Sequence, residues 1–491
     1  MNNQYFENIV ELLQDKKFEF VCQGLTLLET CLDDDPDKYI WGQICEVNRI
    51  FEDFRHDTWH VDKYPTWLRP AKFRRYVALW ILGYRAKVAD PNVRSVTSLS
   101  VNEPEFPTFP ETLQHLTWLE SFSLNRSKWT KLPDMFAGFT ALRELDLFDN
   151  ELMVLPPSLV HCTSLTNITI RHNPINNIPD FICDLHQLRT LNLSATGIQR
   201  LPERIGNLKK LHTLELQDSQ ISSLPDSIGA LDHLKTLHLS RSAIKTLPDT
   251  IGDLSRLEDC YLSVCKQLES LPKTIRVIRC GSALIYRLWD DFMHLPNLER
   301  FRLSDWQKPR KQEAKVLNFG QFPKLKHLEM SWGVFDLDSV LECKQLEFLK
   351  LSGDQTALPE SIGQLTHLKH LELRHSKVSV LPDSISNLHQ LEYISFPDDR
   401  TGFDSSIEIR RFDHLLGKHN GVAKNTKKYN DPVEIRWQLY FDNAPTDNSE
   451  LLRRKWTAQI FEEIEGTERL ESLHVSLDRE TDFPDISQCV Y

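Results

Sequence analysis

The chain has 491 residues, 40% of them hydrophobic and 26% charged, which is enough for about three globular domains or one long repeat array. Lys and Arg total 58 and Asp and Glu total 70, and the resulting net charge of −12 argues against nucleic acid or an anionic membrane as the main partner. No apolar run reaches the roughly 18 residues of a spanning helix.

The opening residues, MNNQYFENIVELLQ, contain neither the basic nor the apolar part of a secretory signal. We therefore expect a cytoplasmic protein whose ten cysteines are reduced thiols, although secretion by another route stays open.

The glycines exclude several enzyme classes. Only 17 are present, and the closest two are Gly417 and Gly421. GxGxxG and GxxxxGK[ST] loops both need clustered glycines to bring backbone N–H groups onto a phosphate. GxSxG, HExxH, HRD and DFG are also absent. We expect no catalysis, cofactor, metal or small-molecule substrate.

Residues 1–92 contain no repeat. Helical periodicity covers residues 8–32 and 68–87, and DDDPD (33–37) and DKYPTW (62–67) indicate breaks. Because an uncapped repeat array would expose an apolar edge, we predict a helical N-terminal domain that covers the first repeat.

Residues 93–397 contain a tandem repeat. An apolar anchor recurs every 23 residues, at Val96, Leu119, Leu142, Leu165, Leu188, Leu211, Leu234 and Leu257. A proline follows the first seven anchors at the same spacing, at Pro110, Pro133, Pro156, Pro179, Pro202, Pro225 and Pro248. Beyond Leu257 the unit length varies between 18 and 27 residues, and the array has about fourteen units.

Each unit has two halves. LxxLxL predicts a short strand with its leucines buried, and LPxxIGxLxxL predicts a helix-like return. A small polar residue at the ninth position can satisfy backbone groups where the strand ends. These residues are Asn150, Asn173, Thr196, Ser219 and Ser242.

At these positions the chain resembles the leucine-rich repeat family. The LPxxIGxLxxL return is similar to that of intracellular scaffolds related to Ras-group and plant intracellular leucine-rich repeat proteins. Residues 257–272 resemble a unit of plant immune-receptor repeats. The resemblance implies an α/β solenoid: a horseshoe with a parallel concave sheet, an N-terminal helical cap and an α+β C-terminal cap.

The exposed face of the predicted sheet changes along the array. In the early units it is small and polar, which predicts an inert surface. From the sixth unit it contains charged and aromatic residues of the kind that form protein-binding hot spots. The candidate partner-binding residues are Tyr261, Arg279, Arg302, His327, Glu329, Trp332, Phe348, Lys350, His370, Glu372 and Tyr393. The alternative is that these are ordinary solvated positions.

Cysteine and histidine give weaker signals. Cys162, Cys260, Cys280 and Cys343 occupy leucine positions and Cys265 the ninth position, so we interpret them as core residues. His56 and His60 could share a helical face, but they lie at a predicted break and have no further ligand pair.

Residues 398–491 are predicted to be an α+β C-terminal cap. VEIRWQLYF (433–441) and RLESLHVSL (469–477) have strand patterns, and residues 449–466 have a helical one. The basic stretch 418–428 could bind nucleic acid or anionic lipid, which conflicts with the net charge.

We therefore predict a non-catalytic signalling scaffold that binds another protein through the concave face of its repeats. The alternative is a secreted bacterial effector or ubiquitin-ligase-like protein that uses the repeats for substrate recognition and has its activity within residues 398–491.

Overall fold

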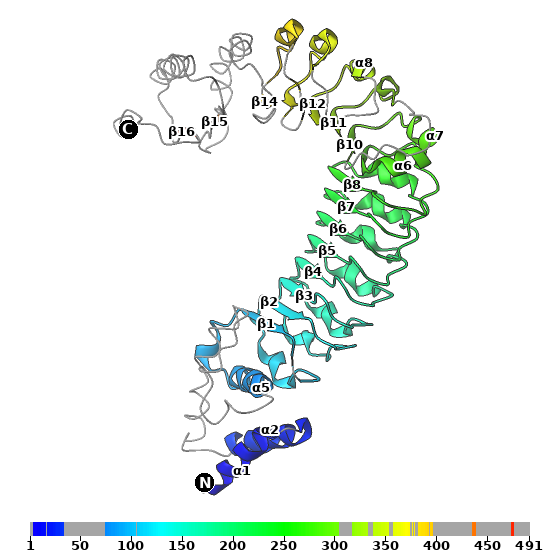
Figure 1. The fold of residues 1–491 in the computed structure, drawn as a ribbon. Helices are drawn as coiled ribbons and strands as arrows, with labels where there is room; N and C mark the ends of the chain where they lie inside the picture. Colours follow the sequence, from blue (N-terminus) through cyan, green and yellow to red (C-terminus); the bar gives the residue numbers. More distant parts are fainter. Residues whose placement is uncertain are drawn as a thin grey trace, which may run out of the picture. The chain divides into compact units, whose positions relative to one another are not determined.

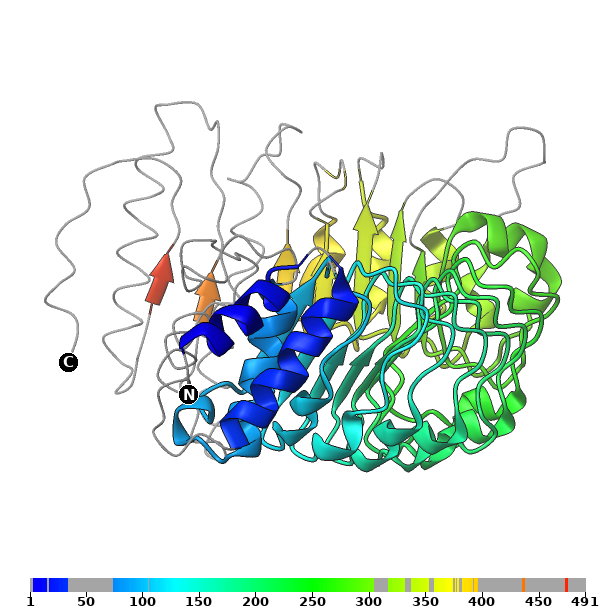
Figure 2. The same ribbon diagram turned by 90° about the horizontal axis from the view of Figure 1, so that it is seen from below.

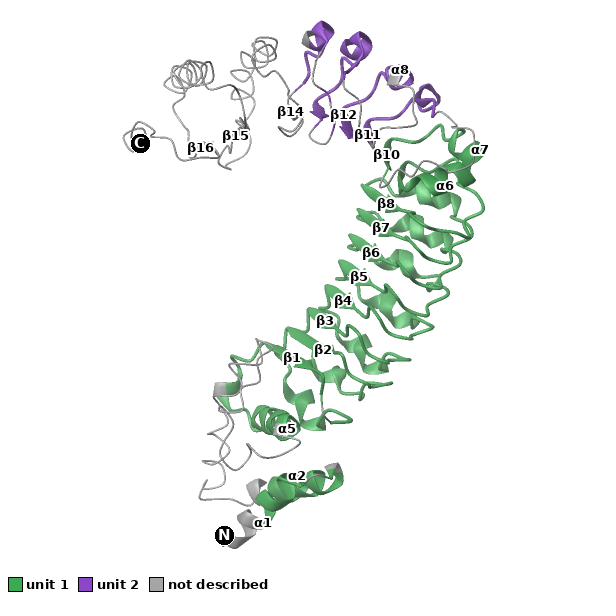
Figure 3. Ribbon diagram, viewed as in Figure 1, with its two compact units in different colours: residues 1–307 green, residues 308–491 purple. Residues whose placement is uncertain are grey.

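The computed structural model describes residues 3–33, 74–303, 317–331, 337–352 and 357–391, apart from 16, 105, 374–375, 377 and 379–381, and three short strands further on. The chain divides into two compact units, residues 1–307 and 308–491 (Figure 3). The domain boundaries expected at 92/93 and 397/398 stay predictions.

In unit 1, ten parallel strands follow one another in chain order across one sheet (Figure 1). They are β1 (Ser98–Asn102), β2 (Ser121–Asn125), β3 (Glu144–Asp146), β4 (Asn167–Thr169), β5 (Thr190–Asn192), β6 (Thr213–Glu215), β7 (Thr236–His238), β8 (Asp259–Tyr261), β9 (Val277–Cys280) and β10 (Arg300–Leu303). Equivalent repeat positions pair, as in Leu191 with Leu214 and Leu214 with Leu237. The predicted strands, their parallel pairing and their register are confirmed.

Alternation along each strand separates the core from the open face. In β6, Leu214 is fully buried, whereas Thr213 and Glu215 on either side are partly exposed. Burying one leucine side chain stabilises the fold by roughly 1.5–3 kcal/mol. Because the same alternation recurs in every repeat, the leucines of neighbouring repeats stack into one continuous core.

The return segments form short 3₁₀ helices, where the sequence predicted only a helix-like turn. In η9 (Asp226–Ala230), Pro225 precedes the first turn with φ of −71°, the value that its ring imposes, and Ile228 is buried. The others in the array of unit 1 are η4 (Glu111–His115), η5 (Phe136–Gly138), η6 (Pro157–His161), η7 (Asp180–Asp184), η8 (Ile205–Asn207) and η10 (Asp249–Asp253). After β9, where Trp289 replaces the proline, two α-helices form instead: α6 (Ser282–Arg287) and α7 (Trp289–Phe292).

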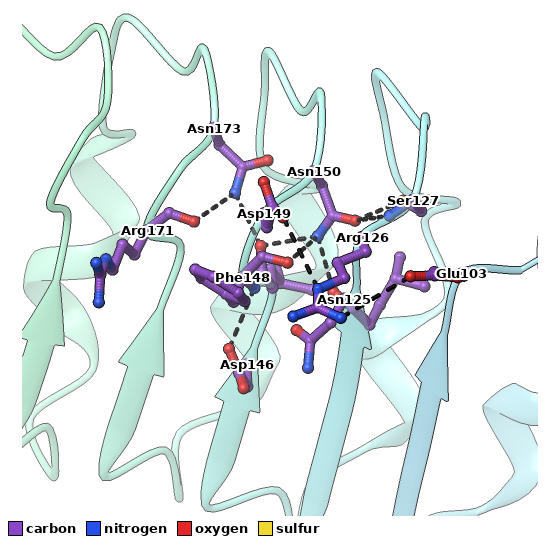
Figure 4. A network of polar contacts seen from close by, with 12 residues as sticks. Glu103, Asn125, Arg126, Ser127, Asp146, Phe148, Asp149, Asn150, Arg171 and Asn173 are labelled. Atoms are coloured by element: carbon purple, nitrogen blue, oxygen red, sulfur yellow. Dashed lines mark hydrogen bonds and ion pairs between the residues drawn. The ribbon is translucent and has the colours of Figure 1, made fainter. Parts of the chain in front are cut away.

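The ninth repeat position satisfies backbone carbonyls where the strand ends, as predicted for Asn150, Asn173, Thr196 and Ser219, and its asparagines also bond adjacent repeats together. The Asn150 side-chain amide donates to the carbonyls of Leu124 and Leu147, at 2.7 and 2.8 Å (Figure 4). Its Oδ1 accepts from both the N–H and the hydroxyl of Ser127. Asn173 repeats the pattern one unit later, and it donates to the same Leu147 carbonyl at 2.8 Å.

The residue just before this position has a left-handed backbone in eight successive repeats. Its φ lies between 48° and 60°, although none of these residues is glycine. They are Glu103, Arg126, Asp149, His172, Ala195, Asp218, Arg241 and Val264. Some neighbours form exposed ion pairs, as Arg126 does with Glu103 at 3.9 Å and with Asp149 at 4.0 Å (Figure 4).

Three helices lie at the β1 end of unit 1: α1 (Asn3–Leu13), α2 (Phe18–Asp33) and α5 (Arg74–Lys87) (Figures 1 and 2). Helix α5 packs on the first 3₁₀ helix of the array, where the Thr112 hydroxyl donates to the Trp80 carbonyl at 3.1 Å. Lys87 of α5 pairs with Glu29 of α2 at 2.7 Å. The prediction of a helical cap on the first repeat is therefore confirmed. The short η3 (Pro91–Val93) joins α5 to β1.

Unit 2 continues the repeat with four parallel strands: β11 (His327–Ser331), β12 (Phe348–Ser352), β13 (His370–Glu372) and β14 (Tyr393–Ser395). Their pairing confirms the predicted unit lengths, since His327 pairs with Phe348, Phe348 with His370 and His370 with Tyr393. The helices are η11 (Phe319–Gln321), α8 (Leu337–Val340), η12 (Glu360–Gln364) and η13 (Asp383–Asn387).

Two further strands, β15 (Ile435–Trp437) and β16 (Leu473–Val475), pair in parallel and fall within the two segments with strand patterns. The helix expected at 449–466, the basic stretch 418–428 and the pair His56 and His60 lie outside the described residues. None of the helices described is long and apolar enough to cross a bilayer.

Candidate functional site

A row of side chains crosses the open face of unit 1 at right angles to the strands. In β6–β10 the register places Glu215, His238, Tyr261, Arg279 and Arg302 side by side, one from each strand. We call these five residues the central row. Three of them, Tyr261, Arg279 and Arg302, are predicted site residues, and the structure brings them together.

The first four side chains of the central row contact one another in sequence. Glu215 Oε2 accepts a hydrogen bond from His238 Nδ1 at 2.9 Å. The His238 ring lies 4.4 Å from the Tyr261 ring, centroid to centroid, at an interplanar angle of 32°. The Arg279 guanidinium lies 4.7 Å from the same ring and donates to the tyrosine hydroxyl at 3.3 Å. Tyr261 is thus held between a histidine and an arginine.

Asp259 completes the cluster from the neighbouring position of β8. Its carboxylate accepts a hydrogen bond from Arg302, two strands away, and its Oδ1 lies 3.7 Å from Arg279 Nη1. Sequence reasoning missed Asp259, although it lies only two residues before Tyr261 and its type is complementary to the two arginines. All three charged side chains stay between 18% and 33% exposed, so a partner can still reach them.

The earlier half of the open face is largely uncharged. The row continues through Ser100, Ser123, Thr169 and Asn192, as the sequence indicated. Strand β3 is the exception, because it contributes Glu144 and Asp146. Burial raises the pKa of Asp146. This effect outweighs the hydrogen bonds that Asp146 accepts from the Phe148 N–H and from Asn125, which lower the pKa.

Unit 2 groups most of the other predicted site residues. The His327 ring stacks on Phe348 at 4.1 Å and 8°, and Phe348 stacks on His370 at 5.9 Å. Beside this stack, His327 Nε2 bonds Glu329 at 2.8 Å, and Lys350 pairs with Glu372 at 3.0 Å.

Two predicted site residues stay untested at the side-chain level. Tyr393 lies in β14, in register with His370, and only its backbone is described. Trp332 lies outside the described residues.

The cysteines predicted to be core residues, Cys162, Cys260, Cys265, Cys280 and Cys343, are buried, and so is Cys183, for which the sequence analysis made no prediction. Burial raises the pKa of the Cys162, Cys260 and Cys343 thiols to about 12. It also raises the pKa of Cys183 and Cys265 to about 11. Because the thiolate is the reactive form, these residues are poor nucleophiles. Among the described residues, no three His, Cys, Asp or Glu side chains gather closely enough to hold a metal ion.

Comparison with known proteins places the fold in a class. Residues 172–278 match the family model of a leucine-rich repeat region. Together with the parallel strands of the predicted spacing within each unit, this match gives the array the fold of a leucine-rich repeat solenoid. None of the curated proteins compared with the chain matches it significantly.

Solved structures of other leucine-rich repeat proteins resemble the chain in part. A protein of Leptospira interrogans is 27% identical, with 67% of this chain and 78% of that one covered and a TM-score of 0.42. The ectodomain of a plant membrane receptor kinase of Arabidopsis thaliana is 24% identical, with 62% and 39% covered and a TM-score of 0.38. An internalin of Listeria monocytogenes is 18% identical, with 66% and 91% covered and a TM-score of 0.39.

Proposed function

We propose that the protein is a non-catalytic cytoplasmic scaffold that binds another protein through the open face of its repeats, with the central row and Asp259 as the main contact. Leucine-rich repeat solenoids typically present an extended face to protein partners. The observation that carries the proposal is the position of Tyr261, which is half-buried between His238 and Arg279.

The central row has the physical properties of a binding hot spot. Tyrosine and arginine dominate such sites because they bury a large area with few rotatable bonds. Here each side chain already has a partner within the protein, so little side-chain entropy is lost when a second protein binds. The partial exposure of Arg279 and Arg302 leaves further hydrogen-bonding capacity for that protein.

In unit 2 we assign the stack of His327, Phe348 and His370 and the adjacent pair Lys350–Glu372 as a second contact region. The same kind of observation supports this second region as supports the central row. Aromatic and charged side chains gather on a sheet face, and in-register neighbours are in contact. Glu329, Trp332 and Tyr393 belong to this proposed region by sequence position.

The test is affinity measurement with a captured partner. Full-length protein serves as bait, the captured protein is purified, and its Kd is measured against the unmodified chain, Tyr261→Ala and Arg302→Ala. We expect each substitution to weaken binding by at least about tenfold, or 1.4 kcal/mol, because a preorganised anchor is lost.

Thr169→Ala is the matched control, because Thr169 occupies the same row in β4. It should change the Kd by less than about twofold. Equal tolerance of alanine at Tyr261, Arg302 and Thr169, with every variant folded by circular dichroism, would contradict the proposal.

A further inference from the structure

A second row of side chains lies at the edge of the sheet where the strands of unit 1 begin. Backbone hydrogen bonds of 2.7–2.8 Å link its residues from one repeat to the next, as between Arg143 N–H and the Glu120 carbonyl. We call this row the start edge. It consists of Thr97, Glu120, Arg143, Thr166, Arg189, His212, Lys235 and Glu258.

Two of the four cations at this repeat position in unit 1 are matched by a carboxylate in the next repeat. Lys235 pairs with Glu258 at 3.0 Å, and further along Arg276 forms a bidentate pair with Glu299 at 2.8 and 3.0 Å. Arg143 and Arg189 differ. Arg189 lies between Thr166 and His212, and Arg143 lies between Glu120 and Thr166. Arg143 and Glu120 form no ion pair, and neither guanidinium has an ion-pair partner among the described residues.

Both arginines line one cavity of about 530 Å³. It lies between three consecutive repeats, and the other lining residues are Thr163, Ser164, Thr166, Asp184, His186 and Gln187. Asp184 is the one carboxylate in this set, and Arg204 binds it at 2.6 Å. The uncompensated charge of the cavity wall is therefore positive, although the whole chain carries −12.

The adjacent surface extends this positive region. Lys210 Nζ donates to the side-chain oxygen of Gln187 in the cavity wall at 2.6 Å. Because this acceptor is neutral, it does not balance the charge of Lys210. The Nδ1 atoms of His212 and His233 lie 2.6 and 2.9 Å from the backbone carbonyls of Lys210 and Lys209.

We propose that the start edge of β3–β5 is a docking surface for an extended acidic segment of a partner protein, with Arg143 and Arg189 as the residues that bind its carboxylates. The two arginines are two strands apart, or roughly 10 Å at the usual strand spacing. In an extended chain, residues three apart are also separated by roughly 10 Å, so two carboxylates of one segment can reach both guanidiniums.

This surface is distinct from the central row. It lies before the strands begin and belongs to the earlier repeats, whereas the central row lies on the open face of β6–β10. A protein partner is favoured over nucleic acid because a chain of net charge −12 repels a polyphosphate at long range, whereas a short acidic segment makes only local contacts.

The test uses the full chain and a fluorescent polyglutamate peptide of about ten residues, long enough to span both arginines. Fluorescence anisotropy at low ionic strength measures the Kd for the unmodified chain, Arg143→Glu, Arg189→Glu and Arg200→Glu. Arg200→Glu is the charge-matched control: Arg200 is an exposed arginine of the same array that lies away from the cavity.

We expect Arg143→Glu and Arg189→Glu each to raise the Kd by at least about tenfold, and Arg200→Glu by less than about twofold. Tyr261→Ala should leave peptide binding unchanged, so that failure here is separable from failure of the open-face proposal. Absence of binding to the unmodified chain would overturn the inference, as would equal losses in all three arginine variants. Tighter binding of a single-stranded oligonucleotide than of polyglutamate, lost in the same variants, would instead assign the edge to nucleic acid.

Discussion

The position before the ninth residue of each repeat shows how the array constrains a single residue. Its backbone is left-handed in eight repeats, whichever residue type is present. Aspartate and histidine tolerate this conformation better than most residues, whereas a β-branched side chain is strained there. The least suited of the eight is Val264, with φ of 60°. The turn that ends each strand therefore imposes the left-handed conformation, and the packing of the array offsets its steric cost.

Val264→Gly is expected to stabilise the protein. The valine side chain is 50% exposed, so its removal loses little burial, and glycine adopts positive φ without steric cost. We expect the free energy of unfolding to rise by about 1 kcal/mol, measured by urea denaturation. Val154→Gly is the control, because Val154 is 58% exposed and lacks positive φ; it should lower stability by about 0.5–1 kcal/mol. A loss of stability in both variants would show that position 264 is not strained.

At the scale of elements, the cap depends on a close approach between a helix and a loop. Helix α5 lies so near the first 3₁₀ helix that a Cβ on Gly83 would be 2.4 Å from the Thr112 carbonyl carbon. Alanine would normally favour a helix by about 1 kcal/mol over glycine. Here the steric cost is larger, because the opposing atoms belong to backbone that cannot rotate away. The glycine therefore determines how closely the cap covers the leucines of the first repeat.

Gly83→Ala should accordingly destabilise the cap by about 1–3 kcal/mol, the usual cost of an overpacked core position. The readout is amide hydrogen exchange, which should lose protection in α5 and β1 before β6. Gly24→Ala in α2 is the comparison, since its new Cβ would approach leucine side chains at 3.0–3.1 Å rather than backbone. Protection that is unchanged in α5 after Gly83→Ala would contradict the close packing described here.

Over the whole array, stability is approximately a sum of repeats and of the interfaces between them. Leu214 of β6 is fully buried and pairs in register with Leu191 and Leu237. A cavity at this position weakens the interfaces of the β6 repeat with both of its neighbouring repeats. Its effect should spread outwards from β6 and diminish with distance, unlike the all-or-none loss expected of a small globular domain.

Leu214→Ala should cost about 2–5 kcal/mol through lost burial and the cavity left behind. Hydrogen exchange should show the greatest loss of protection in β5, β6 and β7 and a smaller loss in β1. Met153→Ala, at a side chain that is 60% exposed, should leave the exchange pattern unchanged. Uniform loss of protection from β1 to β10 after Leu214→Ala would mean that the array unfolds as a single cooperative block.

Only some of the candidate site residues could be predicted from the sequence. Tyr261, Arg279 and Arg302 were predicted because their repeat positions point away from the buried leucines. Asp259 was missed, since its contact with Arg302 joins strands that are two apart, at a separation that varies with repeat length. Arg143 and Arg189 were also missed. They occupy the same repeat position, but whether a cation there has a partner depends on the side chains in adjacent repeats.

The repeat spacing by itself determined the strands, their order and register, and which side chains form the core, because a fixed period brings the same apolar positions together in every turn of the solenoid. Local pattern could not determine the left-handed turn residues, the 3₁₀ form of the returns or the depth at which α5 docks. Those features were decided by tertiary structure, through contacts between residues in different repeats whose distances and charges no single repeat contains.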